Sequence, residues 1–368
     1  MLSIYIHIPF CIKKCSYCDF VSFVDYENKI DNYIDGLEKE IVLSTKINEI
    51  KNKEVGTIFF GGGTPSILSV KQLEKILQNI KNNFCILENC EITIEVNPAT
   101  DINFAEIQKN GFNRVSIGVQ SFNDNELSFL ERLHNSKIAE NTIEKAKKYF
   151  DNISIDLIYG IPNQTLQSFE NTLNKAMALK LKHISAYNLE YKENTKLGTM
   201  HNNNNVIKPS VELEIEMYEM LCSKLKNNTF YQYEVSNFAV PNYECKHNQN
   251  YWHRVDYIGF GIAAHSCLSN IRFSNTDNLQ TYFQCVEQNK LPITSSEKLT
   301  DKNIYEEKIF LGLRSDGINE NLLNDKQMQF MKECIKFGFA IKNGKFFVLT
   351  TTGKFITDTI VLKVLEKM

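Results

Sequence analysis

Three cysteines near the start of the chain offer the clearest chemistry in the sequence. Cys11, Cys15 and Cys18 form a C-x3-C-x2-C pattern directly after an apolar segment. Thiolates are soft ligands that suit zinc and iron–sulfur clusters. A structural zinc site commonly takes four ligands from two C-x2-C pairs, and no second pair follows, since Cys85 and Cys90 are five residues apart. Three thiolates in one loop therefore favour a [4Fe–4S] cluster with one open iron, with zinc completed by a distant histidine as the alternative.

A run of glycines follows the next apolar segment. Residues 61–65 read GGGTP and come directly after TIFF at 57–60. Glycine lets the backbone approach a ligand closely and present its N–H groups to it. Such a run by itself usually indicates only a turn, so its meaning depends on the elements around it.

The elements that must position these residues alternate between short apolar strands and amphipathic helices. Strands are predicted at 3–8, 57–60, 91–96, 114–119, 153–160 and 183–189. Repeated strand–helix units predict an α/β fold with a parallel sheet. Six units make either an open (β/α)6 barrel or a doubly wound sheet, and the pattern alone does not choose between them.

The character of the chain changes after residue 195. The segment 230–275 is rich in aromatic residues and asparagine, and a helix is expected from about 296. A hairpin turning at Asn343-Gly344 and a last helix complete a small winged-helix-like α+β module. We therefore expect three parts: 1–195 as the barrel core, 196–295 as a connecting region, and 296–368 as the C-terminal module.

Composition narrows the class of protein. The chain has 368 residues, of which 43% are hydrophobic and 23% charged, and its net charge is -3. This balance argues against a nucleic-acid partner, which usually selects a basic excess. Neither a signal peptide nor an apolar run of 18 residues is evident. We expect a cytoplasmic protein without a transmembrane segment, in which the ten cysteines are thiols or metal ligands rather than disulfides.

The cysteine spacing and the GGGTP segment together resemble the radical S-adenosylmethionine (SAM) superfamily. An aromatic residue before the third cysteine, here Tyr17, is typical of that superfamily. The resemblance implies a partial (β/α)6 barrel, a [4Fe–4S] cluster on Cys11, Cys15 and Cys18, and SAM chelated to the open iron. It also implies that the glycine segment binds the amino group of SAM.

Further segments resemble one branch, which contains the oxygen-independent coproporphyrinogen III oxidases and the HemW heme chaperones. They are YIHIPFC at 5–11, EITIEVNP at 91–98, GFNRVSIGVQSFN at 111–123, LERLHN at 130–135 and DLIYGIP at 156–162. The resemblance implies a set of SAM-binding residues at the strand ends: Tyr5, Tyr17, Gly62, Gly63, Thr64, Glu95, Gln120, Arg132 and Asp156.

The chemistry of four of these side chains agrees with such a role. Asp156 can accept hydrogen bonds from ribose hydroxyls or pair with an ammonium group, and Arg132 can form a charge-assisted fork to a carboxylate. Gln120 offers both a donor and an acceptor. Glu95 lies on a strand that reads as buried, where an unpaired charge is costly.

Two features separate the chaperone from the oxidase. The oxidase has a fourth cysteine where this chain has Phe20, and it has an N-terminal extension before the first strand. His247-Asn248-Gln249-Asn250-Tyr251-Trp252 resembles the H-N-x-x-Y-W motif implicated in heme binding in the chaperones. The resemblance implies heme contact by His247, Tyr251 and Trp252, with Cys245 and His253 as other candidate iron ligands.

We therefore predict a heme chaperone that binds the cluster, SAM and heme, and delivers heme to an acceptor hemoprotein. The pattern names no catalytic side chain. Oxidative decarboxylation of coproporphyrinogen III is the alternative function, and a radical SAM enzyme acting on another substrate such as RNA is a third. An electron donor, a homodimer and peripheral membrane contact are left open, and His265, in GFGIAAHS at 259–266, receives no role.

Overall fold

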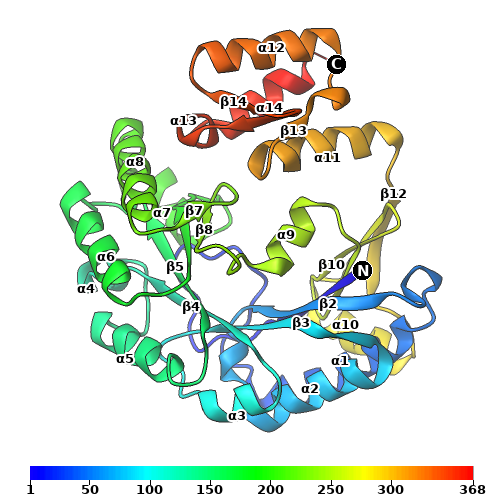
Figure 1. Ribbon diagram of the computed structural model, residues 1–368. Helices are drawn as coiled ribbons and strands as arrows, with labels where there is room; N and C mark the ends of the chain where they lie inside the picture. Colours follow the sequence, from blue (N-terminus) through cyan, green and yellow to red (C-terminus); the bar gives the residue numbers. More distant parts are fainter. Residues whose placement is uncertain (368) are drawn as a thin grey trace.

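Six parallel strands form the centre of the protein, seen in a computed structural model that describes residues 1–367 (Figure 1). They are β1 (Leu2–Ile8), β2 (Glu54–Gly62), β3 (Cys85–Val96), β4 (Arg114–Gln120), β5 (Asn152–Tyr159) and β6 (His183–Asn188). Neighbouring strands pair in sequence order, and β1 and β6 are not paired with each other within residues 1–367. This order confirms the predicted α/β class with a partial (β/α)6 barrel.

Amphipathic helices cover the outside of this sheet. They are α1 (Ile30–Ser44), α2 (Val70–Asn83), α3 (Phe104–Lys109), α4 (Asp124–Phe129), α5 (Ser136–Ala146) and α6 (Leu166–Ala178). The second helix shows why: Ser69 and Gln72 form a capping box at its N-terminus, and its buried face faces the sheet. Satisfied N-terminal N–H groups and one apolar stripe are the two requirements of such a helix.

The alternation of side chains along each strand creates a lumen. In β1, Ile4, Ile6 and Ile8 belong to the main hydrophobic core. Tyr5 and His7 alternate with them, and successive side chains of a strand point to opposite faces. The polar faces of the strands therefore meet inside the barrel.

The sheet continues beyond the barrel at both ends. The added strands are β9 (Tyr257–Phe260), β10 (His265–Leu268), β11 (Ile271–Asn275) and β12 (Ile293–Lys298) next to β1, and β8 (Asn237–Ala239) and β7 (Tyr231–Gln232) next to β6. The region between the barrel and the last module also contains four helices: α7 (Lys196–Asn202), α8 (Val211–Asn227), α9 (Lys246–Trp252) and α10 (Leu279–Glu287). In Figure 1, α9 lies between the barrel and the C-terminal module.

One predicted boundary is wrong in this region. Residues 296–298, predicted as the start of a helix, belong to β12, whose residues are all exposed. An edge strand without a buried face has no alternating hydrophobic pattern, so its sequence does not reveal it. The helix itself begins at Asp301 behind a capping box made by Thr300 and Asn303.

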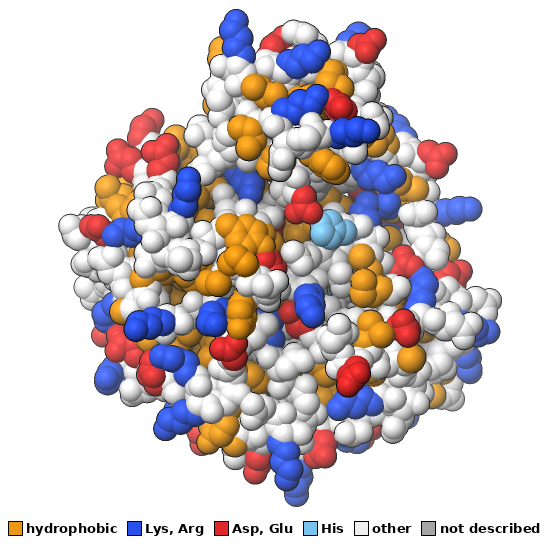
Figure 2. Space-filling model, in the orientation of Figure 1, with side chains coloured by type: hydrophobic (Ala, Val, Ile, Leu, Met, Phe, Trp, Pro, Cys, Tyr) orange, Lys and Arg blue, Asp and Glu red, His pale blue; other side chains and the backbone are white. Residues whose placement is uncertain are grey.

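The C-terminal module has its own hydrophobic core. Its elements are α11 (Asp301–Arg314), β13 (Ile318–Asn319), α12 (Asp325–Lys336), β14 (Ala340–Asn343), β15 (Phe346–Leu349), α13 (Thr351–Phe355) and α14 (Thr357–Leu365). Its three strands pair in the order β13-β15-β14, and the predicted hairpin turns at Asn343-Gly344. The small winged-helix-like α+β module is confirmed. Figure 2 shows basic and acidic side chains mixed over the visible face of both parts.

Within residues 1–367, no helix combines the length and the apolar character needed to cross a membrane.

Candidate functional site

The three cysteines lie on the loop that follows β1, at the C-terminal end of the barrel strands. Cys11 is buried, whereas Cys15 and Cys18 are half-buried. The backbone N–H of Cys11 donates to the Phe23 carbonyl at 2.9 Å, which joins the two arms of the loop. His7 reaches the same loop, since its Nε2 lies 2.9 Å from the Val21 carbonyl oxygen. The strand and the returning chain therefore fix the loop that carries the thiols.

Burial and nearby hydrogen-bond donors act in opposite directions on the ionisation of the thiols. Burial raises the pKa of Cys11, and it raises the pKa of Cys18 to about 11. Arg132 Nη1 donates to Cys15 Sγ at 3.2 Å, and Thr64 Oγ1 donates to Cys11 Sγ at 3.5 Å. Within residues 1–367, no group of three His, Cys, Asp or Glu side chains converges on one ion position. Three soft thiols on one loop, two of them with a hydrogen-bond donor at the sulfur, are a donor set that fits an iron–sulfur cluster.

The glycine segment packs against the cysteine loop. The N–H of Gly63 donates to the Ile8 carbonyl at 2.8 Å. A Cβ on Gly63 would lie 2.8 Å from the Phe10 carbonyl oxygen and 3.0 Å from Cys11 Sγ, and one on Gly62 would lie 2.6 Å from the His7 ring. Only glycine permits this approach, and Gly62 also has φ of +109°.

Two half-buried carboxyl groups, Glu95 and Asp156, lie on neighbouring strands beside this segment. Burial, followed by the nearby Asp156, raises the pKa of Glu95 to about 8, although the Gly62 N–H donates to it. Burial likewise raises the pKa of Asp156, which accepts a hydrogen bond from Ser116 Oγ at 3.2 Å. Neither carboxyl group forms a salt bridge with another described residue. Arg114 is the one cation that acts on both acids, and neither is ion-paired, so the pair fits a ligand that carries an ammonium or sulfonium charge.

Arg132, Tyr17 and Gln120 complete the predicted SAM set. Arg132 Nη2 donates to the Gly118 carbonyl at 2.7 Å, while its buried Nε has no partner among the described residues. Tyr17 lies close enough to the guanidinium to raise the pKa of Arg132. Gln120 ends β4 with φ of +67°, a conformation that non-glycine residues adopt rarely and often at functional sites. The structure thus gathers the predicted SAM residues around one end of the lumen.

The H-N-x-x-Y-W segment forms α9, at the opposite end of the lumen. Glu91 lies on β3, six residues after the start of this strand, and accepts hydrogen bonds from the N–H groups of Lys246 and His247 at 3.3 and 3.1 Å. A carboxylate on the first turn of a helix satisfies free N–H groups and complements the helix dipole. Because Cys245 makes no side-chain cap of its own, Glu91 replaces the usual capping residue.

His247 is fully engaged inside the protein. Its Nδ1 lies 2.8 Å from Thr57 Oγ1 and its Nε2 lies 3.0 Å from the hydroxyl of Tyr251. The ring stacks on Phe59 at 5.1 Å between centroids. Burial and the nearby Arg114 lower the pKa of His247 to about 3, so the imidazole is neutral. Tyr251 and Trp252 are half-buried, and His247 is separated from the open lumen by Tyr251.

A cleft of about 450 Å³ lies between the cysteine loop and α9. It is lined by Tyr5, His7, Asp19, Phe20, Val21, Tyr251, Tyr257, Ala263, Ala264 and His265. The sequence predicted Tyr5 and Tyr251 as site residues but assigned no role to His265 or Tyr257. The alternation of the β9 and β10 segment was too short to show which side chains face the lumen.

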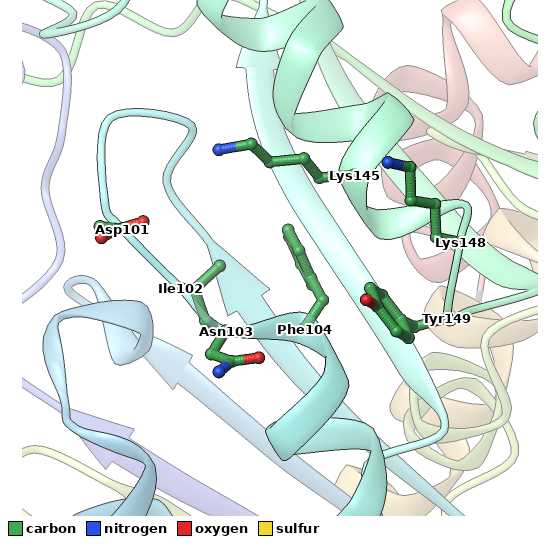
Figure 3. A pocket seen from close by; sticks show the side chains of 7 residues that line it. All are labelled: Asp101, Ile102, Asn103, Phe104, Lys145, Lys148 and Tyr149. Carbon is green, nitrogen blue, oxygen red and sulfur yellow. The ribbon is translucent and has the colours of Figure 1, made fainter.

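A second hollow lies outside the barrel, beside α3 and α5 (Figure 3). Its lining contains Asp101, Ile102, Asn103, Phe104, Lys145, Lys148 and Tyr149. None of the predicted site residues belongs to it, so the lumenal cleft is the candidate site.

Comparisons with known proteins identify the family of the chain. Residues 5–176 match the radical SAM superfamily. The heme chaperone HemW of Bacillus subtilis is 35% identical over 89% of this chain and 87% of its own length, and HemW of Buchnera aphidicola is 35% identical over 94% and 96%. HemW of Escherichia coli is 35% identical over 72% and 69%. The solved coproporphyrinogen III oxidase HemN of Escherichia coli, described as a radical SAM enzyme, is 24% identical with a TM-score of 0.85 over 100% of this chain and 90% of its own, which shows a shared fold.

Proposed function

The chain belongs to the HemW heme chaperone family of the radical SAM superfamily, and from this premise we propose that it binds heme and delivers it to an acceptor hemoprotein. The observation that carries the proposal is the similarity to HemW over nearly the whole chain, including α9 and the C-terminal module. The aromatic cleft beside the cysteine loop supports it, because a porphyrin ring packs well between aromatic side chains.

We further propose that Cys11, Cys15 and Cys18 hold a [4Fe–4S] cluster. Arg132 and Thr64 support it by donating hydrogen bonds to two of the three thiols. Hydrogen bonds to the sulfur ligands tune a cluster and orient its ligands. A bound cluster supplies an open iron and one-electron redox chemistry.

The proposed SAM site uses the polar residues at the same end of the lumen. Glu95 and Asp156 offer negative charge to the cationic part of the ligand, and Arg132 and Gln120 offer donors to its carboxylate and ribose groups. Gly62 and Gly63 leave room for backbone contact. These are binding roles, and the proposal requires no side chain to transfer a proton.

Phe20 favours heme carriage over coproporphyrinogen oxidation. This side chain is 62% exposed at the mouth of the cleft, where it adds apolar surface instead of a fourth thiol. An aromatic ring at the mouth of the cleft can pack against the face of a porphyrin.

Two assays on the cluster-loaded protein test the proposed function. We expect hemin to give a saturable Soret shift, and the heme-loaded protein to transfer heme to apomyoglobin, followed by the visible spectrum of the separated acceptor. Anaerobic incubation with coproporphyrinogen III, SAM and a reductant is expected to give no protoporphyrinogen IX. The absence of a Soret shift, or formation of that product, contradicts the proposal.

A further inference from the structure

The lumenal cleft contains one histidine whose imidazole is free. His265 begins β10, lines the cleft and is exposed, and its ring forms no hydrogen bond with another residue in the described part of the chain. His7 lines the same cleft, but its Nδ1 lies 3.2 Å from the Tyr5 hydroxyl and its Nε2 lies 2.9 Å from the Val21 carbonyl oxygen. A metal ligand needs an unshared nitrogen lone pair directed at the site, and His265 meets that requirement.

The other nitrogen and sulfur ligands near α9 are less accessible. His247 has both ring nitrogens engaged, and Cys245 is fully buried beside Glu91. His253 is exposed but lies outside the cleft lining, where its Nε2 is 2.7 Å from Asp316 of the C-terminal module. The sequence motif thus lies close to the cleft, while its histidine does not reach the open space.

The loop that carries His265 is rigidly held. The Gly261 N–H donates to Glu40 at 2.9 Å, and the Ile262 N–H donates to the Tyr33 hydroxyl at 3.0 Å. On the other side, the Asn275 N–H donates to the Ala264 carbonyl at 2.9 Å. A ligand on a fixed loop binds without a large loss of conformational entropy.

The remainder of the lining suits a flat apolar ring. Tyr5, Tyr251, Tyr257 and Phe20 contribute aromatic surface from β1, α9, β9 and the cysteine loop. Asp19 is the one charged residue in the lining, which has no lysine or arginine. Such a lining disfavours an anion such as phosphate and favours an apolar ring whose carboxylates point out of the open mouth. The volume of about 450 Å³ lies within the range of cofactor pockets.

We propose that His265 is an axial ligand of heme iron in this cleft. The inference rests on the proposed heme binding and specifies its site. Heme then lies between α9 and the cysteine loop, with Tyr251 packing against the porphyrin and His247 holding Tyr251 in place from behind.

Hemin titration of the cluster-loaded protein tests this assignment by difference spectra and by electron paramagnetic resonance. We expect His265→Ala to shift the Soret maximum, change the iron spin state and weaken hemin binding about tenfold or more. Added imidazole is expected to restore the wild-type spectrum, which a merely structural role would not produce. His201→Ala, which removes a histidine of α7 outside the cleft lining, serves as the matched control and should leave spectrum and affinity unchanged, and His253→Ala tests the other exposed histidine.

The outcomes separate this inference from the proposed function. If wild-type protein binds hemin and His265→Ala keeps its spectrum and affinity, the inference is wrong and the heme chaperone proposal stands. If His253→Ala instead changes the spectrum and His265→Ala does not, the ligand is wrongly assigned. If wild-type protein shows no hemin binding at all, both proposals fail. The absorbance of the iron–sulfur cluster in each variant verifies that the fold is intact.

Discussion

The two ends of the barrel lumen use polar side chains in opposite ways. At the cysteine end, Cys15 and Cys18 are half-buried, the Nε of Arg132 has no partner among the described residues, and Glu95 forms no salt bridge with a described residue. At the α9 end, His247 has a partner for each ring nitrogen, and Asn250 Nδ2 donates to Ser3 Oγ at 2.8 Å. The first end has binding capacity that its own residues do not use, whereas the polar side chains of α9 are satisfied by the protein, even though the buried Nε of the neighbouring Arg114 has no partner among the described residues.

This difference separates binding from support. Buried polar groups normally find partners within the protein, so a group without one marks a place where a ligand can supply it. By that criterion the cysteine end binds cofactors, and the interior of α9 fixes the far wall of the cleft. Residues of α9 that line the cleft, such as Tyr251, are then free to contact a ligand bound in it.

The largest effect is expected from removing one cluster ligand. Cys15→Ser should abolish the iron–sulfur absorbance of anaerobically reconstituted protein, because a serine hydroxyl is a poor ligand for a soft iron site. Iron content and absorbance provide the measurement. Cys85→Ser is the matched control, since Cys85 is exposed on β3 away from the loop, and it should retain the full cluster. Equal loss in both variants would show that the cysteine end is not the specific ligand site.

A large loss of stability is expected at the other end. His247→Ala leaves Thr57 without its partner and opens space beside Phe59, so the free energy of unfolding should fall by about 2–4 kcal/mol. Urea denaturation of the cluster-free protein measures it. His265→Ala, at an exposed site, should change stability by less than about 0.5 kcal/mol. If His247→Ala leaves the free energy of unfolding unchanged, the distinction between the two ends is wrong.

The burial of His247 also predicts how the free energy of unfolding depends on pH. The buried His247 has its pKa lowered to about 3, whereas an unfolded histidine has its ordinary value of 6.5. The contribution of this neutral imidazole is therefore fully present above pH 6.5 and is lost as the pH falls toward 3. In His247→Ala this part of the acid destabilisation should disappear.

A smaller effect is expected for SAM binding at the cysteine end. Burial raises the pKa of Glu95 to about 8, so below that pH the free protein holds this carboxyl protonated. A cationic ligand favours the carboxylate, so binding releases a proton and the affinity rises with pH. We expect the SAM affinity, measured by calorimetry, to fall about fivefold from pH 8 to pH 7.

Glu95→Gln is the matched control for this titration. It keeps the shape and removes the charge, so SAM affinity should fall about tenfold at pH 8 and lose its pH dependence. In the ligand-free wild type the sign is reversed: the protonated carboxyl favours the fold below pH 4.5, and this stability is lost as the pH rises through 8. If Glu95→Gln binds SAM with the same affinity and the same pH dependence as the wild type, Glu95 is not part of the SAM site.

The sequence revealed the cysteine end more fully than the α9 end, for a physical reason. Cys11, Cys15, Cys18 and the GGGTP segment each lie at the end of a strongly apolar strand, so local pattern places them together at one edge of a parallel sheet. The partners of α9 cannot be found in this way, because Glu91 caps His247 across 156 positions of the chain. Strand β12 was missed because its residues are all exposed.

Local sequence pattern also could not predict that His247 of the motif is buried. The resemblance of H-N-x-x-Y-W to the chaperone motif implied that His247 and Tyr251 both contact heme, and the structure places these two residues one helical turn apart on α9. They do share a face, but they use it to bond to each other, and only Tyr251 reaches the cleft. His265, eighteen residues after His247 by number, gave no periodic signal because its strand has four residues.

The smallest predicted effect tests the contact at the boundary between the two ends. Tyr251→Phe removes the hydroxyl that pairs with His247 Nε2 and keeps the ring that lines the cleft. Because water from the cleft can replace this half-exposed hydroxyl, the free energy of unfolding should fall by only about 0.5 kcal/mol. Hemin affinity should stay within about twofold of the wild type if the ring alone packs against the porphyrin. A stability loss as large as that of His247→Ala would instead show that Tyr251 belongs to the supporting core. The aromatic wall of the cleft would then consist of its other aromatic residues.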